Sequence, residues 1–210
     1  MDSDNIEIYS EFGYTNYGVV GDANMVEVPL YSSKRKNGNI ISLTRTEFSK
    51  NSATNNLVMP TKSSIDDMNT NTPITQITYD LYDSKGNLLQ YTKADGTPTT
   101  LLYGYNQTLP IIKIDGAAYS DVAAKLGFPN TNDGYKNLSV VTASNIDSST
   151  NYETQTLIPL LDQLKQNNVL SDYFITTYTY DPLIGVTSIT SPSGEREVYT
   201  YGIANRLKEV

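Results

Sequence analysis

A turn-and-strand unit that occurs twice constrains the fold of this chain more than any other feature. Each copy begins with Tyr-Asp, turns at a first glycine, runs as a strand to a second glycine, and returns to a further tyrosine. The outer tyrosines lie 23 residues apart in the first copy and 21 in the second. Self-similarity at such a period is typical of stacked structural repeats. The residues that define the two copies are Tyr82, Asp83, Gly86, Asp95, Gly96, Tyr105, Tyr180, Asp181, Gly185, Gly194 and Tyr201.

The chemistry of the unit predicts a β-hairpin in each copy. A strand tyrosine buries its ring against a neighbouring strand while its hydroxyl finds a polar partner. The aspartate that follows can accept hydrogen bonds from backbone N–H groups of the turn, and glycine supplies the positive φ that closes the turn. We therefore predict that Tyr82 and Tyr180 occupy equivalent places in two hairpins, and that Asp83 and Asp181 each bond to turn backbone.

Strand-like alternation also occurs before the first copy. Residues 26–31 and 40–48 alternate around Asn37-Gly38, a pair that is typical of a two-residue hairpin turn. The basic run 34–36 is interpreted as the solvated tip of this hairpin. The polar stretch 49–72 is predicted mainly as loop with one short strand at 57–59, and a denser run of strands begins at residue 74.

The strand pattern is interrupted between the two copies. Residues 119–126 predict a weak helix that ends at Gly127. A second helix is predicted from leucines at helical spacing, which are Leu157, Leu160, Leu161 and Leu164. Pro159 lacks a backbone donor and belongs in the first turn, which indicates Thr154 or Thr156 as the N-cap. The leucine stripe is expected to pack on the sheet as ordinary core.

These patterns predict a mainly β chain of antiparallel hairpin repeats with a small helical insertion. Four segments follow from them. Residues 1–73 form an N-terminal hairpin region and polar loop, and residues 74–106 form the first repeat. Residues 107–172 form a mixed insertion with one amphipathic helix, and residues 173–210 form the second repeat and the start of a degenerate third.

The composition excludes several classes of function. Without histidine or cysteine the chain has no Ser-His-Asp triad, no cysteine nucleophile and no thiolate or imidazole zinc site. A net charge of −8 makes nucleic acid a poor partner. No run approaches the ~20 apolar residues of a membrane helix, and the N-terminus lacks the pattern of a signal peptide. We expect no cofactor, no metal, no nucleic-acid partner and no membrane span.

The repeated residues resemble the Rhs (YD-repeat) family. The matching segments are residues 82–88, 95–97, 103–106, 178–187, 192–194 and 199–201. Residues 103–111 are most similar to the Bacteroidetes branch of the family. A third copy opens at Tyr201-Gly202, where glycine stands in place of the aspartate of the family. The motifs span residues 74–210, and residues 1–73 resemble the family only in general character, without its motifs.

The resemblance implies a non-catalytic structural role. Rhs repeats wind as a continuous β-sheet into a hollow shell, which in some members encloses a C-terminal toxin and in others is a surface scaffold. The implied partners are neighbouring repeats of the same parent chain and, in toxin-bearing members, the enclosed toxin domain. The implied location is extracellular or at the bacterial cell surface, after export by a signal outside this chain.

One stretch is similar to a cleavage motif of the family. Some Rhs shells end in an aspartyl self-cleavage motif of the form Asp-Pro-x-Gly, and residues 181–185 have one extra residue before the glycine. This stretch lies inside a repeat. We interpret it as a turn, because proline after aspartate is common turn chemistry.

The residues alone leave three other possibilities to weigh, which are a glycan hydrolase, a binding module and a calcium site. A glycan hydrolase would use paired carboxylates, for which the candidates are Asp80, Asp83, Asp95, Asp181, Glu195 and Glu197; we interpret these as turn and surface residues. A carbohydrate- or protein-binding β-module would use exposed tyrosines, for which the candidates are Tyr14, Tyr17 and Tyr31. Oxygens for calcium are offered by Asp80, Asp83, Ser84 and Asn87, but the spacing of a calcium loop is absent, so this cluster is interpreted as a turn.

The C-terminal strand is expected to carry an open edge. Residues 197–201 are predicted to return as one strand, and the chain ends within the opening third copy. Open edges with alternating valine and tyrosine invite pairing with another chain. The 210-residue chain is therefore expected to self-associate or to fray at this strand.

Overall fold

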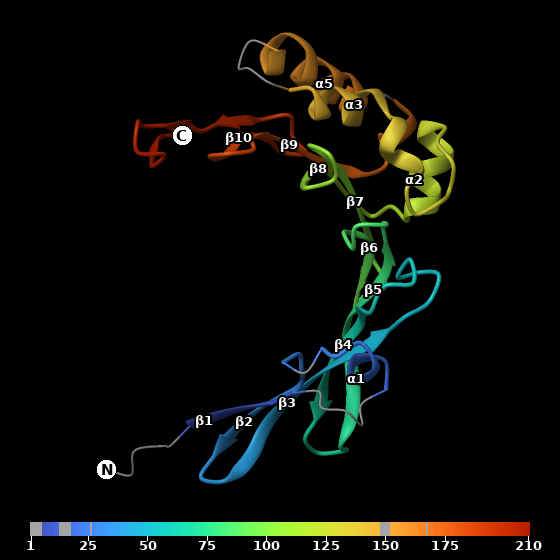
Figure 1. Ribbon diagram of the computed structural model, residues 1–210, viewed down its shortest axis with the longest axis vertical. Coiled ribbons are helices and arrows are strands. Elements are labelled where there is room, and N and C mark those ends of the chain that lie inside the picture. The colour runs from blue at the N-terminus through green and yellow to red at the C-terminus, as the bar shows by residue number, and fades with distance from the viewer. Residues whose placement is uncertain (1–5, 13–17, 26, 148–151, 167) are drawn as a thin grey trace. The chain divides into compact units, whose positions relative to one another are not determined.

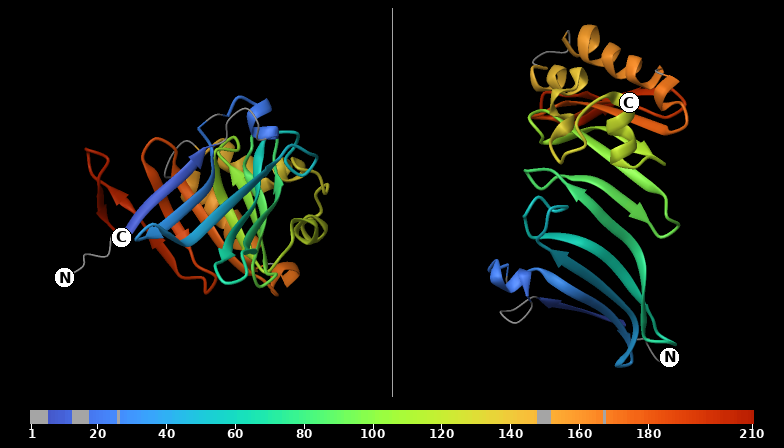
Figure 2. Two further views of the ribbon diagram at one scale, coloured as in Figure 1. Left: turned by 90° about the horizontal axis from the view of Figure 1, so that it is seen from below. Right: turned by 90° about the vertical axis from the view of Figure 1, so that its right-hand side faces the viewer.

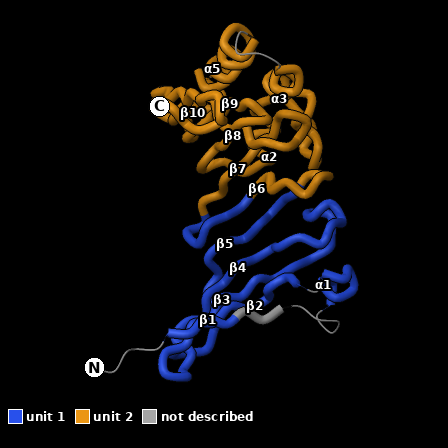
Figure 3. Tube along the Cα trace, turned by 60° about the vertical axis from the view of Figure 1, so that its left-hand side comes forward, with its two compact units in different colours: residues 1–82, 91–96 blue, residues 83–90, 97–210 orange. Residues whose placement is uncertain are grey.

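A computed structural model of the chain describes residues 6–12, 18–25, 27–147, 152–166 and 168–210 (Figure 1). These residues form mainly antiparallel β-strands with a few short helices, as the alternating pattern predicts. The chain divides into two compact units (Figure 3). Unit 1 contains residues 1–82 and 91–96, and unit 2 contains residues 83–90 and 97–210.

Unit 1 is built on five strands that follow one another in sequence order, each paired antiparallel with the next. They are β1 (Ile6–Phe12), β2 (Pro29–Lys36), β3 (Asn39–Ser49), β4 (Met59–Asp67) and β5 (Thr72–Tyr82). The short helix α1 (Val19–Asp22) contacts β3. A further strand, β6 (Leu88–Lys93), contributes its first half to unit 2 and its second half to unit 1.

The hairpin predicted at Asn37-Gly38 is confirmed. Asn37 and Gly38 have φ of 51° and 80°, the positive values that a primed two-residue turn requires. The basic run beside the turn is only partly solvated, because the guanidinium of Arg35 lies 5.3 Å from the ring centre of Tyr9 on the neighbouring strand. A cation over a tyrosine face is attracted by the ring quadrupole.

The prediction that residues 49–72 are mainly loop is wrong, because β4 occupies nine of them. The strand pairs with both β3 and β5, and its polar side chains find cross-strand partners. Arg45 on β3 donates from Nε and Nη2 to the two carboxylate oxygens of Asp66 at 2.7 and 2.6 Å. These bonds lower the pKa of the Asp66 carboxyl. A polar composition therefore does not exclude a strand that is paired on both sides.

Unit 2 continues with five strands, again paired antiparallel in sequence order. They are β7 (Pro98–Gly104), β8 (Leu109–Asp115), β9 (Phe174–Asp181), β10 (Gly185–Thr190) and β11 (Arg196–Val198). The helices are α2 (Tyr119–Leu126), η1 (Gly134–Asn137), α3 (Ser139–Asn145), η2 (Glu153–Leu157), α5 (Ile158–Gln166) and η3 (Asn168–Leu170). Figures 1 and 2 show that these helices lie on one face of the sheet of unit 2.

The core of unit 2 lies between its sheet and its helices. It contains strand residues such as Leu102, Ile112 and Ile114 and helix residues such as Val122 and Leu161, all at most 2% exposed. Unit 1 has few fully buried apolar side chains by comparison. In unit 2 several helices pack on the sheet, whereas the described part of unit 1 has only the short α1 against β3, so the described apolar burial is concentrated in unit 2. Within the described ranges, no helix is long and apolar enough to cross a bilayer.

Both predicted helices of the insertion are present. Helix α2 ends at Gly127, whose φ of 74° closes the helix in the left-handed region. In the second helix Leu157, Leu161 and Leu164 are buried, as the stripe predicts, whereas Leu160 is only half-buried.

The predicted N-cap of the second helix is wrong. Thr154 and Thr156 lie within η2, a π-helical turn that runs directly into α5. Pro159 therefore follows an existing helical turn instead of a capped start. Its missing N–H removes one bond that a regular α-helix would need at this point, and wider turns commonly accommodate such gaps.

The prediction of one C-terminal strand over residues 197–201 is also wrong. β11 pairs with β10, but β12 (Thr200–Tyr201) pairs with β13 (Leu207–Glu209) in a separate two-stranded sheet. Between them the Tyr199 N–H donates to the Thr187 carbonyl at 2.9 Å. The chain stops pairing with β10 at this point, because a new hairpin begins at Tyr201.

Candidate functional site

The tyrosine that opens each copy bonds to main chain of an earlier strand. The Tyr82 hydroxyl donates to the Pro60 carbonyl at 2.6 Å, and the Tyr180 hydroxyl donates to the Pro110 carbonyl at 2.9 Å. Both prolines are the second residue of their strand, β4 and β8. The Tyr201 hydroxyl makes the same type of bond, to the carbonyl of Val186 at 2.8 Å.

The aspartates that follow bond to turn backbone in both copies. Asp83 Oδ1 accepts from the N–H groups of Lys85 and Asn87, each at 2.9 Å. Asp181 Oδ1 accepts from the N–H of Leu183 at 2.9 Å. The stretch at Asp181 that is similar to a cleavage motif is a turn between β9 and β10.

The glycines of the two copies occupy the conformation that their turns need. Gly86, Gly96 and Gly194 have φ of 83°, 83° and 92°. Gly185 has φ of 150°, and a Cβ built there would lie 3.0 Å from the Tyr201 hydroxyl oxygen. This tyrosine of the third copy therefore packs directly on a glycine of the second.

The degenerate third copy keeps the backbone pattern of the first. In the first copy, Asp83 N–H donates to the Asn87 carbonyl and Gly86 N–H to the Asp83 carbonyl. In the third, Gly202 N–H donates to the Arg206 carbonyl and Asn205 N–H to the Gly202 carbonyl, both at 2.9 Å. Asn205 has φ of 52°, a conformation that asparagine tolerates better than most residues. The turn therefore forms without the aspartate.

Asp83 also anchors the loop at residues 105–107, which the sequence analysis did not predict. Its side chain is fully buried, and Oδ2 accepts from Asn87 Nδ2 at 2.8 Å and from Gln107 Nε2 and the Tyr135 hydroxyl at 2.9 Å. Tyr105, Asn106 and Gln107 all have positive φ, 49° to 62°. Such a run is strained. No local pattern indicates it, since only Asn106 is a residue type that favours this conformation.

The two copies meet at Tyr105 and Tyr180. Their rings lie edge to face with centroids 5.6 Å apart, and the Tyr180 N–H donates to the Tyr105 hydroxyl at 2.9 Å. The Tyr105 hydroxyl donates to Asp147 Oδ2 at 2.9 Å. Burial raises the pKa of Tyr180 to about 12 and that of Tyr105 still higher, so both remain neutral.

A buried carboxyl group lies close to this contact. Glu153 is 8% exposed and accepts hydrogen bonds from the hydroxyls of Thr179, at 2.8 Å, and Thr187, at 3.0 Å. Burial raises the pKa of the Glu153 carboxyl, and the negative charges of Asp147 and Asp181 add to the increase. Nothing in the local sequence identified Glu153, which is brought to β9 and β10 by the helical insertion.

The raised pKa predicts that Glu153 makes stability depend on pH. The folded state holds the proton more tightly than the unfolded chain, so the stabilisation is complete below the unfolded pKa of about 4.3 and is lost as pH rises through the folded pKa. In urea unfolding measured from about pH 4 upward, the Glu153→Gln variant should therefore gain stability relative to the natural chain as pH rises. Glu195→Gln, which changes an exposed carboxylate, is the control. A constant difference across this range would contradict the prediction.

The other candidate carboxylates serve local structure or face solvent. Asp80 accepts from the Thr92 hydroxyl at 2.6 Å, and Glu197 accepts from the Tyr199 hydroxyl at 2.6 Å. Asp95 and Glu195 are exposed in turns. The structure brings Asp181 together with Glu153 in one pocket, but neither Glu195 nor Glu197 lines it. In the described part of the chain, no group of three acidic residues could hold a metal ion.

The tyrosines proposed as binding platforms are only partly described. Tyr14 and Tyr17 lie outside the described residues. Tyr31 is half-buried, with the guanidinium of Arg45 5.3 Å from its ring centre, and it lines a pocket of about 480 Å³ together with Phe48 and Glu47. Tyr31 is therefore already engaged on one face of its ring.

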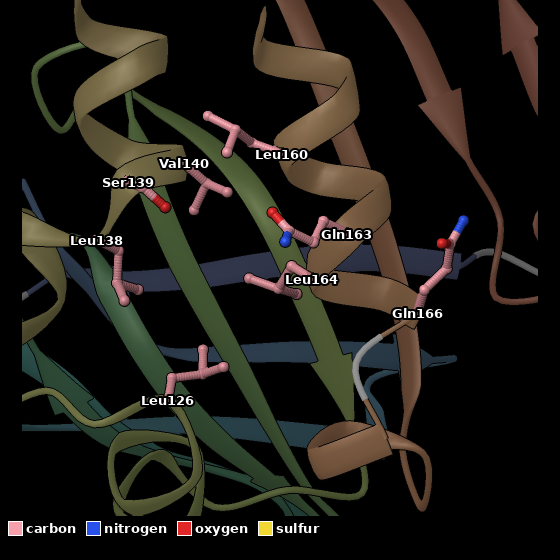
Figure 4. A pocket seen from close by; sticks show the side chains of 8 residues that line it. All are labelled: Leu126, Leu138, Ser139, Val140, Leu160, Gln163, Leu164 and Gln166. Atoms are coloured by element: carbon pink, nitrogen blue, oxygen red, sulfur yellow. The ribbon is translucent and has the colours of Figure 1, made fainter.

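A second pocket, of about 440 Å³, lies between the helices of unit 2 (Figure 4). Figure 4 shows Leu160 and Leu164 pointing from α5 towards Val140 of α3, with Leu126 of α2 on the far side. The half-buried Leu160 thus belongs to an incompletely filled part of the helical layer.

Comparison with known proteins gives only structural neighbours. No family model matches the chain, and no curated protein matches it. Among solved structures, the chain is similar to TcdB2-TccC3-TEV, with a TM-score of 0.43 and 11% identity, and to TcdB2-TccC3 without its hypervariable C-terminal region, with a TM-score of 0.40 and 12% identity. Each match covers 86% of this chain, which spans only 7% and 8% of those chains.

Proposed function

We propose that the chain is a non-catalytic structural segment of a repeat shell of the Rhs type. The observation that carries this proposal is the recurrence of one bond, from the hydroxyl of Tyr82, Tyr180 and Tyr201 to a carbonyl of an earlier strand. Each such bond ties a repeat to the strands before it. A stack of repeats is stabilised in this way, because each repeat relies on its neighbours.

The distribution of polar groups supports a structural role. The carboxylate of Asp83 accepts five hydrogen bonds, two of them from backbone N–H groups, and has little capacity left for a substrate. Asp181 bonds to its own turn. The aspartates of the two copies thus close turns, and Asp83 also joins separate elements.

The biological setting of this proposal follows from the resemblance to Rhs proteins. Neighbouring repeats of the same parent chain would extend the sheet. The assembled shell would enclose a toxin domain or be displayed as a scaffold, outside the cell or at its surface.

Removal of each recurring hydroxyl should weaken the repeats to a similar degree. Tyr82→Phe, Tyr180→Phe and Tyr201→Phe each lose one hydrogen bond, for which we expect a loss of about 1 kcal/mol in the free energy of unfolding. Amide hydrogen exchange should quicken around the carbonyl partner in each variant. Tyr91→Phe is the matched control, since no bond of the Tyr91 hydroxyl is found among the described residues. A loss at only one of the three positions would contradict the repeat interpretation.

The proposal also predicts no measurable turnover of common glycans or esters. The natural chain should release no product above the rate of a buffer blank in assays with chromogenic glycosides and esters. Robust turnover that disappears in Asp83→Asn or Asp181→Asn would overturn the structural role. Glu195→Gln serves as the control for a general change in surface charge.

A further inference from the structure

A pocket of about 320 Å³ lies in unit 2 beside the turn that opens the second copy. Its wall is formed by η2 and the first residue of α5, by the turn between β9 and β10, and by the β11–β12 segment. The lining residues used below are Glu153, Ile158, Asp181, Ile184, Val198 and Tyr201. The volume lies at the lower end of the range for small-ligand pockets, about 300 to 1,000 Å³.

The pocket carries negative charge that the chain does not neutralise. Glu153 is only 8% exposed and accepts hydrogen bonds from two threonine hydroxyls. Asp181 accepts from a backbone N–H. Neither carboxyl forms an ion pair with a described lysine or arginine, and none of the described lining residues is basic. Neutral donors satisfy hydrogen bonds but leave the charge, and a desolvated carboxylate without a counter-ion is unfavourable.

The rest of the wall is apolar. Ile158, Ile184 and Val198 contribute aliphatic side chains from three different segments, and Tyr201 adds an aromatic residue whose hydroxyl is already bonded to the Val186 carbonyl. An aliphatic stem would bury apolar surface here, while a positive head would meet the two carboxyl groups. Lysine and arginine side chains combine these two properties.

We propose that this pocket binds an ammonium or guanidinium group on an aliphatic stem, as presented by a lysine or arginine side chain of a partner polypeptide. The net charge of −8 on the chain favours approach of a basic partner. The proposal goes beyond the structural role of the repeats and does not depend on it. A chain without any shell function could carry the same pocket.

The test uses the full chain labelled with ¹⁵N and three probes that share one stem. Pentylammonium and pentylguanidinium are titrated at neutral pH while amide shifts are followed by NMR, and 1-pentanol is the uncharged control. Both cations should give saturable shifts at Thr187, Ser188 and the neighbouring turn, with millimolar affinity. The cation that binds more tightly, pentylammonium or pentylguanidinium, identifies lysine or arginine as the preferred side chain.

Two variants separate the carboxyl groups from a general charge effect. Asp181→Asn keeps an acceptor for the Leu183 N–H, and Glu153→Gln keeps an acceptor for the threonine hydroxyls, so both should fold. Each should weaken binding of the cations about tenfold, equivalent to about 1.4 kcal/mol. Glu195→Gln, an exposed carboxylate outside the pocket, should leave the affinity unchanged.

Three results would overturn the proposal. They are the absence of saturable shifts with either cation, equal affinity for 1-pentanol, and equal loss of affinity in Glu195→Gln. A failure of this kind would leave the structural role of the repeats untouched, because the tyrosine variants test that role separately.

Discussion

Replacement of Asp83 by alanine should destabilise unit 2 by about 4 kcal/mol or more. The side chain is fully buried, and its two oxygens accept from five donors on Lys85, Asn87, Gln107 and Tyr135. Alanine leaves these donors without a partner, and each buried unsatisfied donor costs about 1 to 3 kcal/mol unless water reaches it. The left-handed run at residues 105–107 should lose its anchor at the same time.

Urea unfolding and amide hydrogen exchange of β7 and β8 would measure this effect. The matched control is Asp181→Ala, which removes the equivalent aspartate of the second copy but only one described hydrogen bond, to Leu183. Its cost should be about 1 kcal/mol. If both variants lose the same stability, the buried network around Asp83 is not what stabilises this region.

Replacement of Gly104 by alanine should cost about 3 kcal/mol. A Cβ at this position would lie 2.1 Å from Ser144 Oγ and 2.9 Å from Ile111 Cγ2. Gly104 ends β7 where α3 packs closely on the sheet. Ser144 cannot rotate away freely, because its hydroxyl donates to the Val141 carbonyl and accepts from the Tyr105 N–H. The added methyl group must therefore push the helix from the strand.

A double variant distinguishes this clash from a general effect of alanine in the strand. Gly104→Ala combined with Ser144→Gly removes the obstructing side chain and should recover about 1 kcal/mol or more, as expected for residues in direct contact. Ser144→Gly alone is the control, since it removes the obstructing side chain without adding a methyl group. Full additivity of the two single changes would contradict the packing explanation.

The elements that could be predicted are those specified by neighbouring residues. Asn37-Gly38 closes a hairpin because both residues accept positive φ, and Gly127 ends α2 for the same reason. The leucine stripe of α5 indicates a buried face because its spacing matches one side of a helix. The bonds of Asp83 and Asp181 to their own turns are also local, spanning two to four residues.

The features that could not be predicted depend on partners far away in the sequence. β4 is polar and resembles loop, but it pairs on both sides and places Asp66 beside Arg45, 21 residues earlier. Glu153 lies in the insertion and meets Thr179 and Thr187 only after folding. The difference between Asp83 and Asp181 likewise comes from Gln107 and Tyr135, which no local pattern connects with either turn.

The sequence by itself determined the hairpin turns of the repeat, because the aspartates and turn glycines act through bonds between near neighbours. Only the tertiary structure decided which repeat residues are structurally critical and where a pocket forms. Asp83 and Asp181 share one motif, yet one is enclosed by a network and the other lines a pocket with Glu153. The physical reason is that burial and uncompensated charge depend on the elements packed around a residue, and these elements come from distant parts of the chain.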